Sequence, residues 1–232
     1  MSARAEPATR WQSDRVFNIG MALAIFATAF VAVATAFVKA DLGIRVLSPR
    51  VQTHAVAFVG WLLLFFTQTV LVASHRLDVH RRLGIAGAVL VSVMMSLTVL
   101  AAVESFRTSG ASFGLISFVV FAVPHVDMII FAPLVVAGLI FRRRPETHKR
   151  LMLLATISLL GETTSRLPML WRLGPQAHFL VQDLFVLAAI AYDLASRGRV
   201  HPVYVWGGLA ILILPPLAGP TWSFLRALQE VQ

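Results

Sequence analysis

The chain has 232 residues, of which 58% are hydrophobic and only 13% are charged. A soluble domain averages about 45–50% apolar and roughly a quarter charged residues, so this composition excludes a soluble globular domain. The lack of cysteine excludes disulfides, thiolate metal sites and cysteine nucleophiles. The formal net charge of +9 indicates the basic loops of a membrane protein. Nucleic-acid binding is not indicated, because the basic residues are not interleaved with aromatic ones and the chain has no soluble module.

Seven segments are apolar over about the 20 residues that a helix needs to cross a bilayer. They cover residues 19–38, 54–73, 83–103, 118–141, 151–167 and 177–195, and a seventh segment starts near Val203. Pro215 and Pro216 are expected to kink or break this seventh helix. Beyond it, apolar residues at helical spacing predict a short interfacial helix. The sequence therefore predicts an all-α integral membrane protein, with an N-terminal segment (1–18), seven transmembrane helices (19–220) and a C-terminal helix (221–232).

Basic residues are distributed unequally between the two sides of these spans. The side with the N-terminus holds 13 Lys and Arg residues and the other side holds 7. Because cytoplasmic loops carry the excess of Lys and Arg, the asymmetry predicts a cytoplasmic N-terminus and a periplasmic C-terminus in a bacterial inner membrane. The first segment also begins like a signal peptide, but its span of about 20 residues favours a retained helix.

Six of the seven histidines form three pairs, and each pair brackets one even-numbered span. The outer members are His54, His125 and His178, and the inner members are His80, His148 and His201. The inner three are expected to converge near Tyr192 and Asp193, as a competent ligand set for Zn, Cu or Fe. The alternative is that each histidine anchors a helix end at the membrane interface. The short metal signatures His-x-x-x-His and His-Glu-x-x-His are absent.

Short runs around these histidines resemble a family of uncharacterised bacterial multi-pass inner-membrane proteins. The runs are His80-Arg81-Arg82-Leu83-Gly84, His148-Lys149-Arg150-Leu151-Met152 and Gly198-Arg199-Val200-His201-Pro202. The resemblance covers residues 52–222 and implies about seven helices, but no established activity. A weaker likeness to di-haem cytochrome-b-type membrane reductases is an analogy that rests on histidines at helix ends.

Ionisable residues also lie inside the spans, toward the predicted outer side. They are Asp127, Glu162, Arg166 and Asp183, with Gln182 and Glu104 nearby. Because ionisable groups are costly in a bilayer and usually pair inside the bundle, we expect the first four to form a buried ionic cluster. Three acids against one arginine leave negative charge for a protonated carboxyl, a histidine or a bound cation to balance.

These features leave three functions open. The leading prediction is a redox-linked protein whose helix-end histidines bind haem or a transition metal. The alternatives are a non-catalytic accessory subunit of a larger membrane complex or homo-oligomer, and a small proton- or cation-coupled transporter that uses the acidic cluster. No nucleophile elbow or phosphate loop is recognisable, so hydrolytic activity is not expected.

Overall fold

The computed structural model describes residues 7–41, 49–109, 126–165, 167–173 and 177–229. These residues form helices joined by turns, and no strand occurs among them. The helices are α1 (Pro7–Asp41), α2 (Pro49–Ala73), α3 (Leu77–Ser109), α5 (Val126–Ile140), α6 (Pro145–Ser158), α7 (Leu160–Thr164), α8 (Pro168–Trp171), α9 (His178–Arg197) and α10 (Pro202–Gln229). The predicted all-α fold is confirmed.

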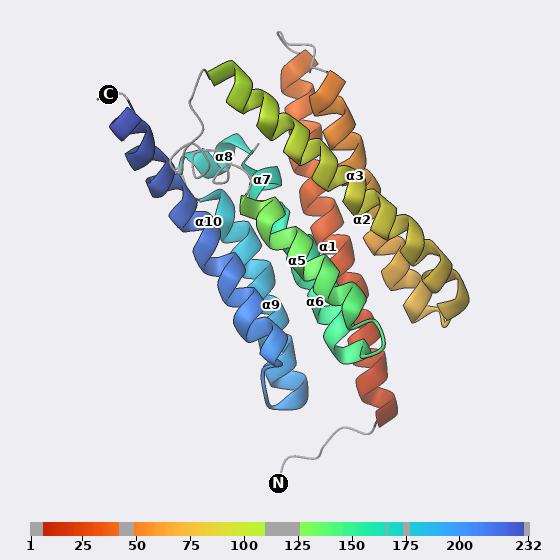
Figure 1. Cartoon of the computed structure of the whole chain (residues 1–232). Coiled ribbons are helices and arrows are strands. Elements are labelled where there is room, and N and C mark those ends of the chain that lie inside the picture. Colours follow the sequence, from red (N-terminus) through yellow and green to blue (C-terminus); the bar gives the residue numbers. More distant parts are fainter. Residues whose placement is uncertain (1–6, 42–48, 110–125, 166, 174–176, 230–232) are drawn as a thin grey trace.

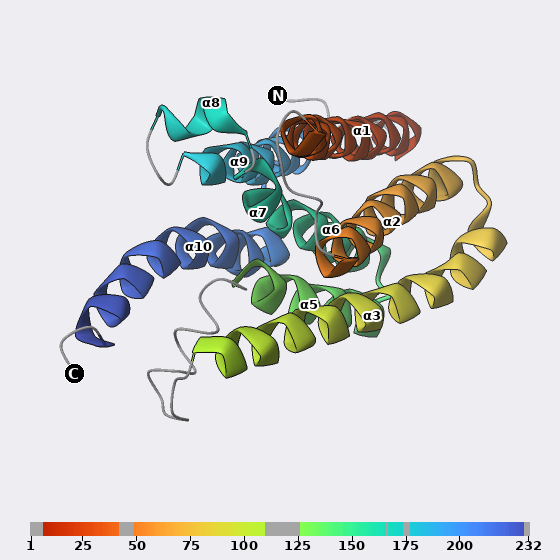
Figure 2. The ribbon, with the colours of Figure 1, turned by 90° about the horizontal axis from the view of Figure 1, so that it is seen from above.

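Successive long helices run in alternating directions, which gives the bundle two ends (Figure 1). We term the end at which α1 begins the basic end, and the other the opposite end. The hairpins α2–α3, α5–α6 and α9–α10 all turn at the basic end (Figure 1). Seen along its length, the bundle has α6 at the centre, with α2 and α3 on one side and α9 and α10 on the other (Figure 2). Accordingly, every residue of α6–α7 from position 153 to 161 is buried.

Four helices are long and apolar enough to cross a membrane, over Trp11–Thr35, Gln52–Ala73, Leu77–Leu100 and His178–Arg197. Val126–Ile140 and Pro202–Leu217 are shorter apolar helices. Large apolar side chains point outward along these helices, among them Phe30, Val56, Ile85 and Leu184. Contiguous apolar surface of this kind is what a lipid bilayer covers, so the helices have the character of an integral membrane protein.

At the other three predicted spans, the structure differs from what the sequence predicts. The span expected at 118–141 begins outside the described residues, and α5 forms its second part. The span expected at 151–167 is divided into α6 and α7, because the helix is interrupted at Leu159. In contrast, α10 is not broken at Pro215 and Pro216 but continues to Gln229, so residues 221–229 extend it.

The packing centre lies where α2, α5 and α10 meet α6. Trp61 donates a hydrogen bond from Nε1 to the Thr156 hydroxyl at 3.3 Å, and its ring meets the ring of Phe131 edge-on with centres 4.9 Å apart. This bond satisfies the polar tip of a buried tryptophan. Gly207 brings α10 close, because a Cβ atom there would lie 2.8 Å from Leu154 Cδ1. The core therefore depends on α6, which holds the other hairpins in position.

Candidate functional site

Two of the predicted histidine ligands, His80 and His148, lie together at the basic end. Their ring centres are 6.2 Å apart and the ring planes are at 82°. His148 Nδ1 lies 2.8 Å from the carbonyl oxygen of Gly138. Since a carbonyl oxygen only accepts, this nitrogen carries the proton and donates. In a neutral ring with this tautomer, the other nitrogen, Nε2, is the acceptor.

Gln68 of α2 completes this group of side chains. Its Nε2 donates a hydrogen bond to the backbone carbonyl of His80 at 3.2 Å. In the described part of the chain, His80 Nδ1 and Gln68 Oε1 are buried and have no hydrogen-bond partner. Because buried polar atoms nearly always have a partner, two such atoms on contacting residues are candidate ligand-binding groups.

His201 lies at the same end but on the other side of α6. Its Nδ1 accepts a hydrogen bond from the Val203 backbone N–H at 3.2 Å, which caps the start of α10. Its own backbone N–H donates to Asp193 Oδ2 at 3.0 Å, and Asp193 in turn pairs with Arg150. His148 and Arg150 are two residues apart and so lie on opposite faces of α6. The structure thus brings together two of the three inner histidines, and the third caps a helix.

Six charged side chains form a second polar group, which we term the charge network. Its members are Asp14, Glu146, Lys149, Arg150, Asp193 and Arg197. At its centre, Arg150 and Asp193 form a bidentate pair in which both side chains are only 2% exposed. Arg150 also donates to the Glu146 carboxylate at 2.8 Å. Three acids balance three bases, so the charge network is neutral as a whole.

Asp14 attaches α1 to this network. Its carboxylate accepts hydrogen bonds from Lys149 Nζ at 2.8 Å, from the Tyr192 hydroxyl at 2.7 Å and from Arg197 Nη2 at 2.6 Å. Beside these bonds, the ring of Phe17 stacks on that of Tyr192 with centres 3.8 Å apart. Because each charge has its partners within the network, we assign it the structural task of joining α1, α6 and α9.

Two of these network residues carry signals that sequence reasoning did not use. Glu146 and Arg150 are four residues apart with the acid first, which is the favourable order for an ion pair on one helix. From the sequence alone, Arg150 belongs to the excess of basic residues that sets the orientation, and Asp193 is expected beside the inner histidines. Asp14 carries no local signal, because its partners lie far away in the sequence.

The charge network predicts a specific response to acid. Burial raises the pKa of Glu146, but hydrogen bonds from Arg150 and Lys149 outweigh it and lower the pKa from 4.5 to about 2. A carboxyl whose pKa is depressed by folding stabilises the protein above its unfolded pKa, and this contribution is lost as the pH falls from 4.5 toward 2. We expect Glu146→Gln to reduce stability at pH 7 and to flatten this acid loss, as measured by thermal unfolding at a series of pH values. Asp78→Asn, which removes an exposed acid on α3, should leave the pH profile parallel to that of the parent.

The pKa of His201 is also lowered, first by burial and then by the positive charge of Arg150. This shift favours the neutral imidazole, whose Nδ1 lone pair can accept the capping hydrogen bond from Val203. The cap is therefore present above the ordinary histidine pKa and weakens as the pH falls below it. His201 thus supports the start of α10, and its first ring nitrogen is already occupied.

The outer predicted sites are described only in part. Asp127 is buried in the first turn of α5, and Asp183 is half-buried on α9. The side chains of Glu162 and Glu104 lie outside the described residues, as does the whole of Arg166. The predicted ionic cluster therefore has two members whose side chains the structure describes.

The outer histidines are likewise described in part. His54 is half-buried in α2, and His125 lies outside the described residues. His178 begins α9, where its carbonyl accepts the Thr164 hydroxyl at 2.8 Å and its ring lies against Phe179 with centres 4.0 Å apart. These contacts connect α7 to α9 at the opposite end.

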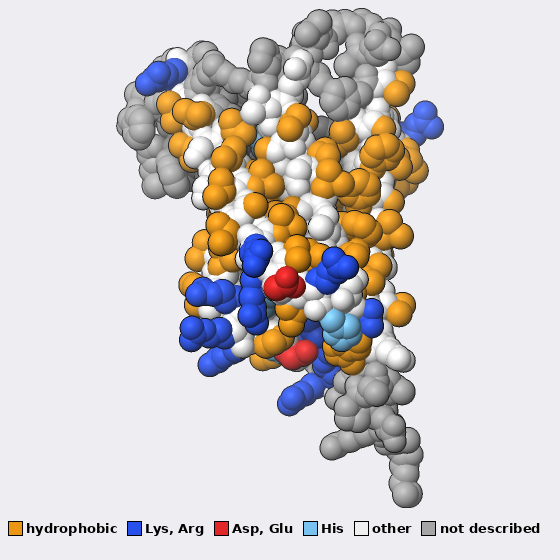
Figure 3. Space-filling model, turned by 90° about the vertical axis from the view of Figure 1, so that its right-hand side faces the viewer, with side chains coloured by type: hydrophobic (Ala, Val, Ile, Leu, Met, Phe, Trp, Pro, Cys, Tyr) orange, Lys and Arg blue, Asp and Glu red, His pale blue; other side chains and the backbone are white. Residues whose placement is uncertain are grey.

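Exposed arginines surround both polar groups. They are Arg76, Arg81, Arg82, Arg142, Arg143, Arg144 and Arg199. Lys and Arg side chains gather toward the basic end, and hydrophobic side chains cover the length above them (Figure 3). At the level of lipid headgroups each such residue would attract anionic lipid by about 1 kcal/mol. The basic end therefore suits the surface of a membrane.

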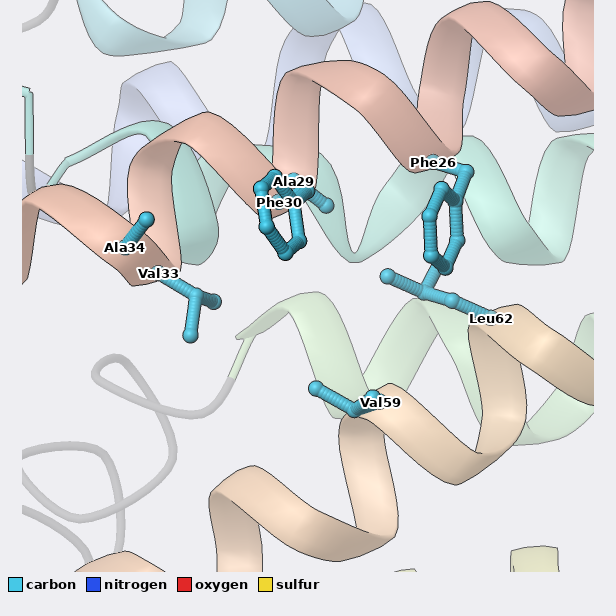
Figure 4. Close-up of a pocket in the computed structure, with 7 residues that line it drawn as sticks. All are labelled: Phe26, Ala29, Phe30, Val33, Ala34, Val59 and Leu62. Atoms are coloured by element: carbon cyan, nitrogen blue, oxygen red, sulfur yellow. The ribbon is translucent and has the colours of Figure 1, made fainter.

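A cavity between α1 and α2 is lined only by apolar side chains. Its volume is about 210 Å³, and its walls are Phe26, Ala29, Phe30, Val33 and Ala34 of α1 with Val59 and Leu62 of α2. These side chains face one another across the gap between the two helices (Figure 4). Such a cavity accepts hydrocarbon but offers no polar group for chemistry.

Within the described ranges, no group of three or more His, Cys, Asp and Glu side chains is arranged to hold a metal ion. Comparison with family models, with curated proteins and with solved structures gives no match. Among the described histidines, His80 and His148 lie side by side.

Proposed function

We propose that this protein is a redox-linked membrane protein in which His80 and His148 would together hold one haem. The observation that supports this proposal is the 6.2 Å between their ring centres. A metal lies about 2.0–2.1 Å from each histidine nitrogen that binds it, so two histidines that hold one metal must be close neighbours. His80 and His148 are such neighbours, with their ring planes at 82°.

The number of ligands favours haem over an ion held by protein alone. Structural and catalytic zinc sites use three or four protein ligands, and no such group occurs among the described residues. Iron in a haem already has four nitrogen ligands from the macrocycle, so a haem would need only the two histidines that this site offers. Of the cofactors predicted from the sequence, haem therefore agrees best with a two-histidine site.

The surroundings of the pair also suit ligation. A histidine that binds a metal usually donates its other N–H to a carbonyl or carboxylate, which fixes the ring and its tautomer. His148 does this through Nδ1 and the Gly138 carbonyl, which leaves Nε2 for a ligand. On the other side, His80 Nδ1 is buried and has no hydrogen-bond partner among the described residues. Bound haem would supply one-electron transfer, with its potential tuned by this partly buried setting.

This function keeps the predicted bacterial inner-membrane location and a bilayer as the surrounding partner. The accessory-subunit prediction is compatible with it, because an electron carrier must meet a second redox protein in the same membrane. No described feature favours the accessory role by itself, so the haem site is the primary proposal.

The proposal is tested by purifying the protein from cells supplied with haem and recording its absorption spectrum. We expect a Soret band and about one haem for each chain, since each chain has one His80–His148 pair. His80→Ala and His148→Ala should each lower the haem content at least about tenfold. His75→Ala is the matched control, because His75 is exposed and its ring stacks on Trp11 with centres 4.5 Å apart. A protein without a Soret band, or variants that keep their haem, would contradict the proposal.

A further inference from the structure

Two consecutive prolines, Pro215 and Pro216, lie inside α10. Proline has no backbone N–H, so the carbonyls of Ile211 and Leu212 receive no hydrogen bond from the residues four positions later. Gln182 of α9 replaces the first of these bonds, because its Nε2 donates to the Ile211 carbonyl at 3.3 Å. Its Oε1 accepts the Gly161 backbone N–H at 3.1 Å, so both ends of this fully buried amide are in use. Gln182 thus serves the Ile211 carbonyl, and the Leu212 carbonyl is the second one that the prolines leave without a donor four positions later.

Asp183, the next residue of α9, lies on the same side of the interface as Leu212. The face of α9 that meets α10 is marked by Val186 and Ile190, which lie 3.2 Å and 3.8 Å from the Cβ position of Gly208. With 3.6 residues per turn, Gln182 and Asp183 lie on either side of this face. The helices are antiparallel (Figure 1), so Ile211 and Leu212 lie on either side of the face of α10 that meets α9. Gln182 meets Ile211 on one side, and the same geometry places Asp183 on the Leu212 side of the interface.

This juxtaposition brings together two acceptors. Asp183 Oδ1 is buried and has no hydrogen-bond partner in the described part of the chain. A carboxylate and a carbonyl cannot bond to each other, and an unpaired charge within a membrane span is costly. One proton on the carboxyl group removes the charge and also provides the missing donor. A metal cation would need about six oxygen ligands, far more than this pair provides.

We propose that Asp183 is a proton-binding site whose carboxyl O–H donates to the carbonyl of Leu212. Asp183 is only half-buried, so the proton can exchange with the medium at the opposite end of the bundle. This site lies at the other end from His80 and His148, and it does not rest on the proposed haem.

The other titratable groups near this end of α9 are few. On α9 itself there is His178, and on α7 there is Glu162, whose side chain lies outside the described residues. The stretch of α10 that packs here, from Gly208 to Leu217, has no titratable residue. The charged side chains of α6 belong to the basic end. Asp183 is thus the carboxyl group that the α9–α10 interface itself provides.

The test is infrared spectroscopy of the full chain in lipid nanodiscs. At pH 7 we expect a C=O stretching band of a protonated carboxyl group that shifts in D2O. Asp183→Asn should abolish this band, while Asp78→Asn, which changes an exposed acid on α3, should preserve it. A wild-type spectrum without the band, or an unchanged band in Asp183→Asn, would overturn the proposal.

The acceptor is tested by restoring one backbone donor at a time. Pro216→Ala returns the N–H that bonds the Leu212 carbonyl, so the Asp183 band should shift to higher frequency as its hydrogen bond is lost. Pro215→Ala returns the N–H for the Ile211 carbonyl, which Gln182 already serves, and should leave the band in place. Both variants remove a proline from a helix, so neither is expected to unfold the protein. A band that does not respond to Pro216→Ala would overturn the assignment to Leu212.

Discussion

Asp193→Ala is expected to lower the free energy of unfolding by about 3–5 kcal/mol, because it leaves a buried guanidinium without its main partner. The side chains of Arg150 and Asp193 are both 2% exposed, and Arg150 Nε donates to Asp193 Oδ2 at 3.2 Å. Glu146 remains bound to Arg150, but its side chain is 56% exposed and cannot replace a buried counter-charge. Denaturant unfolding in detergent micelles, followed by circular dichroism, measures the loss.

A double variant separates the effect of a lost partner from the net contribution of the pair. Replacing a buried ion pair by apolar residues of similar volume is often neutral or stabilising. Arg150→Met combined with Asp193→Leu should therefore recover most of the stability that Asp193→Ala loses. If Asp193→Ala instead unfolds within about 1 kcal/mol of the parent, the range of a surface ion pair, then this pair is not buried as described.

Asp14→Ala is expected to cost about 2–4 kcal/mol and to release the first part of α1 from the bundle. The carboxylate of Asp14 is 14% exposed and accepts charged donors from Lys149 and Arg197 together with the Tyr192 hydroxyl. Without it, Lys149 and Arg197 are left as two neighbouring positive charges with only Glu146 and Asp193 to balance them. The stacking of Phe17 on Tyr192 remains, but it provides no charge.

The rate of limited proteolysis near the N-terminus measures this release, and thermal unfolding measures the stability. Gln12→Ala is the matched control, because Gln12 is exposed on the same turn of α1. Cleavage and unfolding of Asp14→Ala that match those of Gln12→Ala would contradict the assigned role of Asp14 in joining α1 to α6 and α9.

The membrane character of the fold was predictable because it depends on local composition. Apolar runs such as 54–73 and 177–195 are long enough to cross a bilayer, and the structure contains helices over both. The boundaries were harder to predict, because side chains compete with the backbone. Near Leu159 the hydroxyls of Ser158 and Thr163 bond backbone carbonyls, and there the expected single helix divides into α6 and α7. Conversely, Gln182 donates a hydrogen bond to the Ile211 carbonyl, which receives none from Pro215, and α10 continues past the prolines.

For the candidate site too, the histidine spacing predicted one part of the arrangement, and the tertiary structure decided the other. His80 and His148 lie in the first turns of α3 and α6, and His201 directly precedes α10. These three helices all begin at the basic end (Figure 1), as the spacing of the histidines predicts. The spacing did not show which histidines would meet, since that depends on the rotation of each helix about its axis. His148 faces α3 and α5, whereas Arg150, two residues later, faces α9. His201 therefore joins Asp193, and the predicted group of three becomes a pair.

By itself, the sequence determined that this chain is α-helical and apolar enough for a membrane, and that basic residues and histidines recur at helix ends. These properties follow from residue type and spacing along one helix, which do not require a partner. Only the tertiary structure decided that Asp14 joins Lys149 and Arg197, that His80 meets His148, and that Gln182 meets the Ile211 carbonyl. Such pairings arise between helices that are far apart in the sequence, and the rotation and depth at which those helices pack is settled by the fit of their side chains.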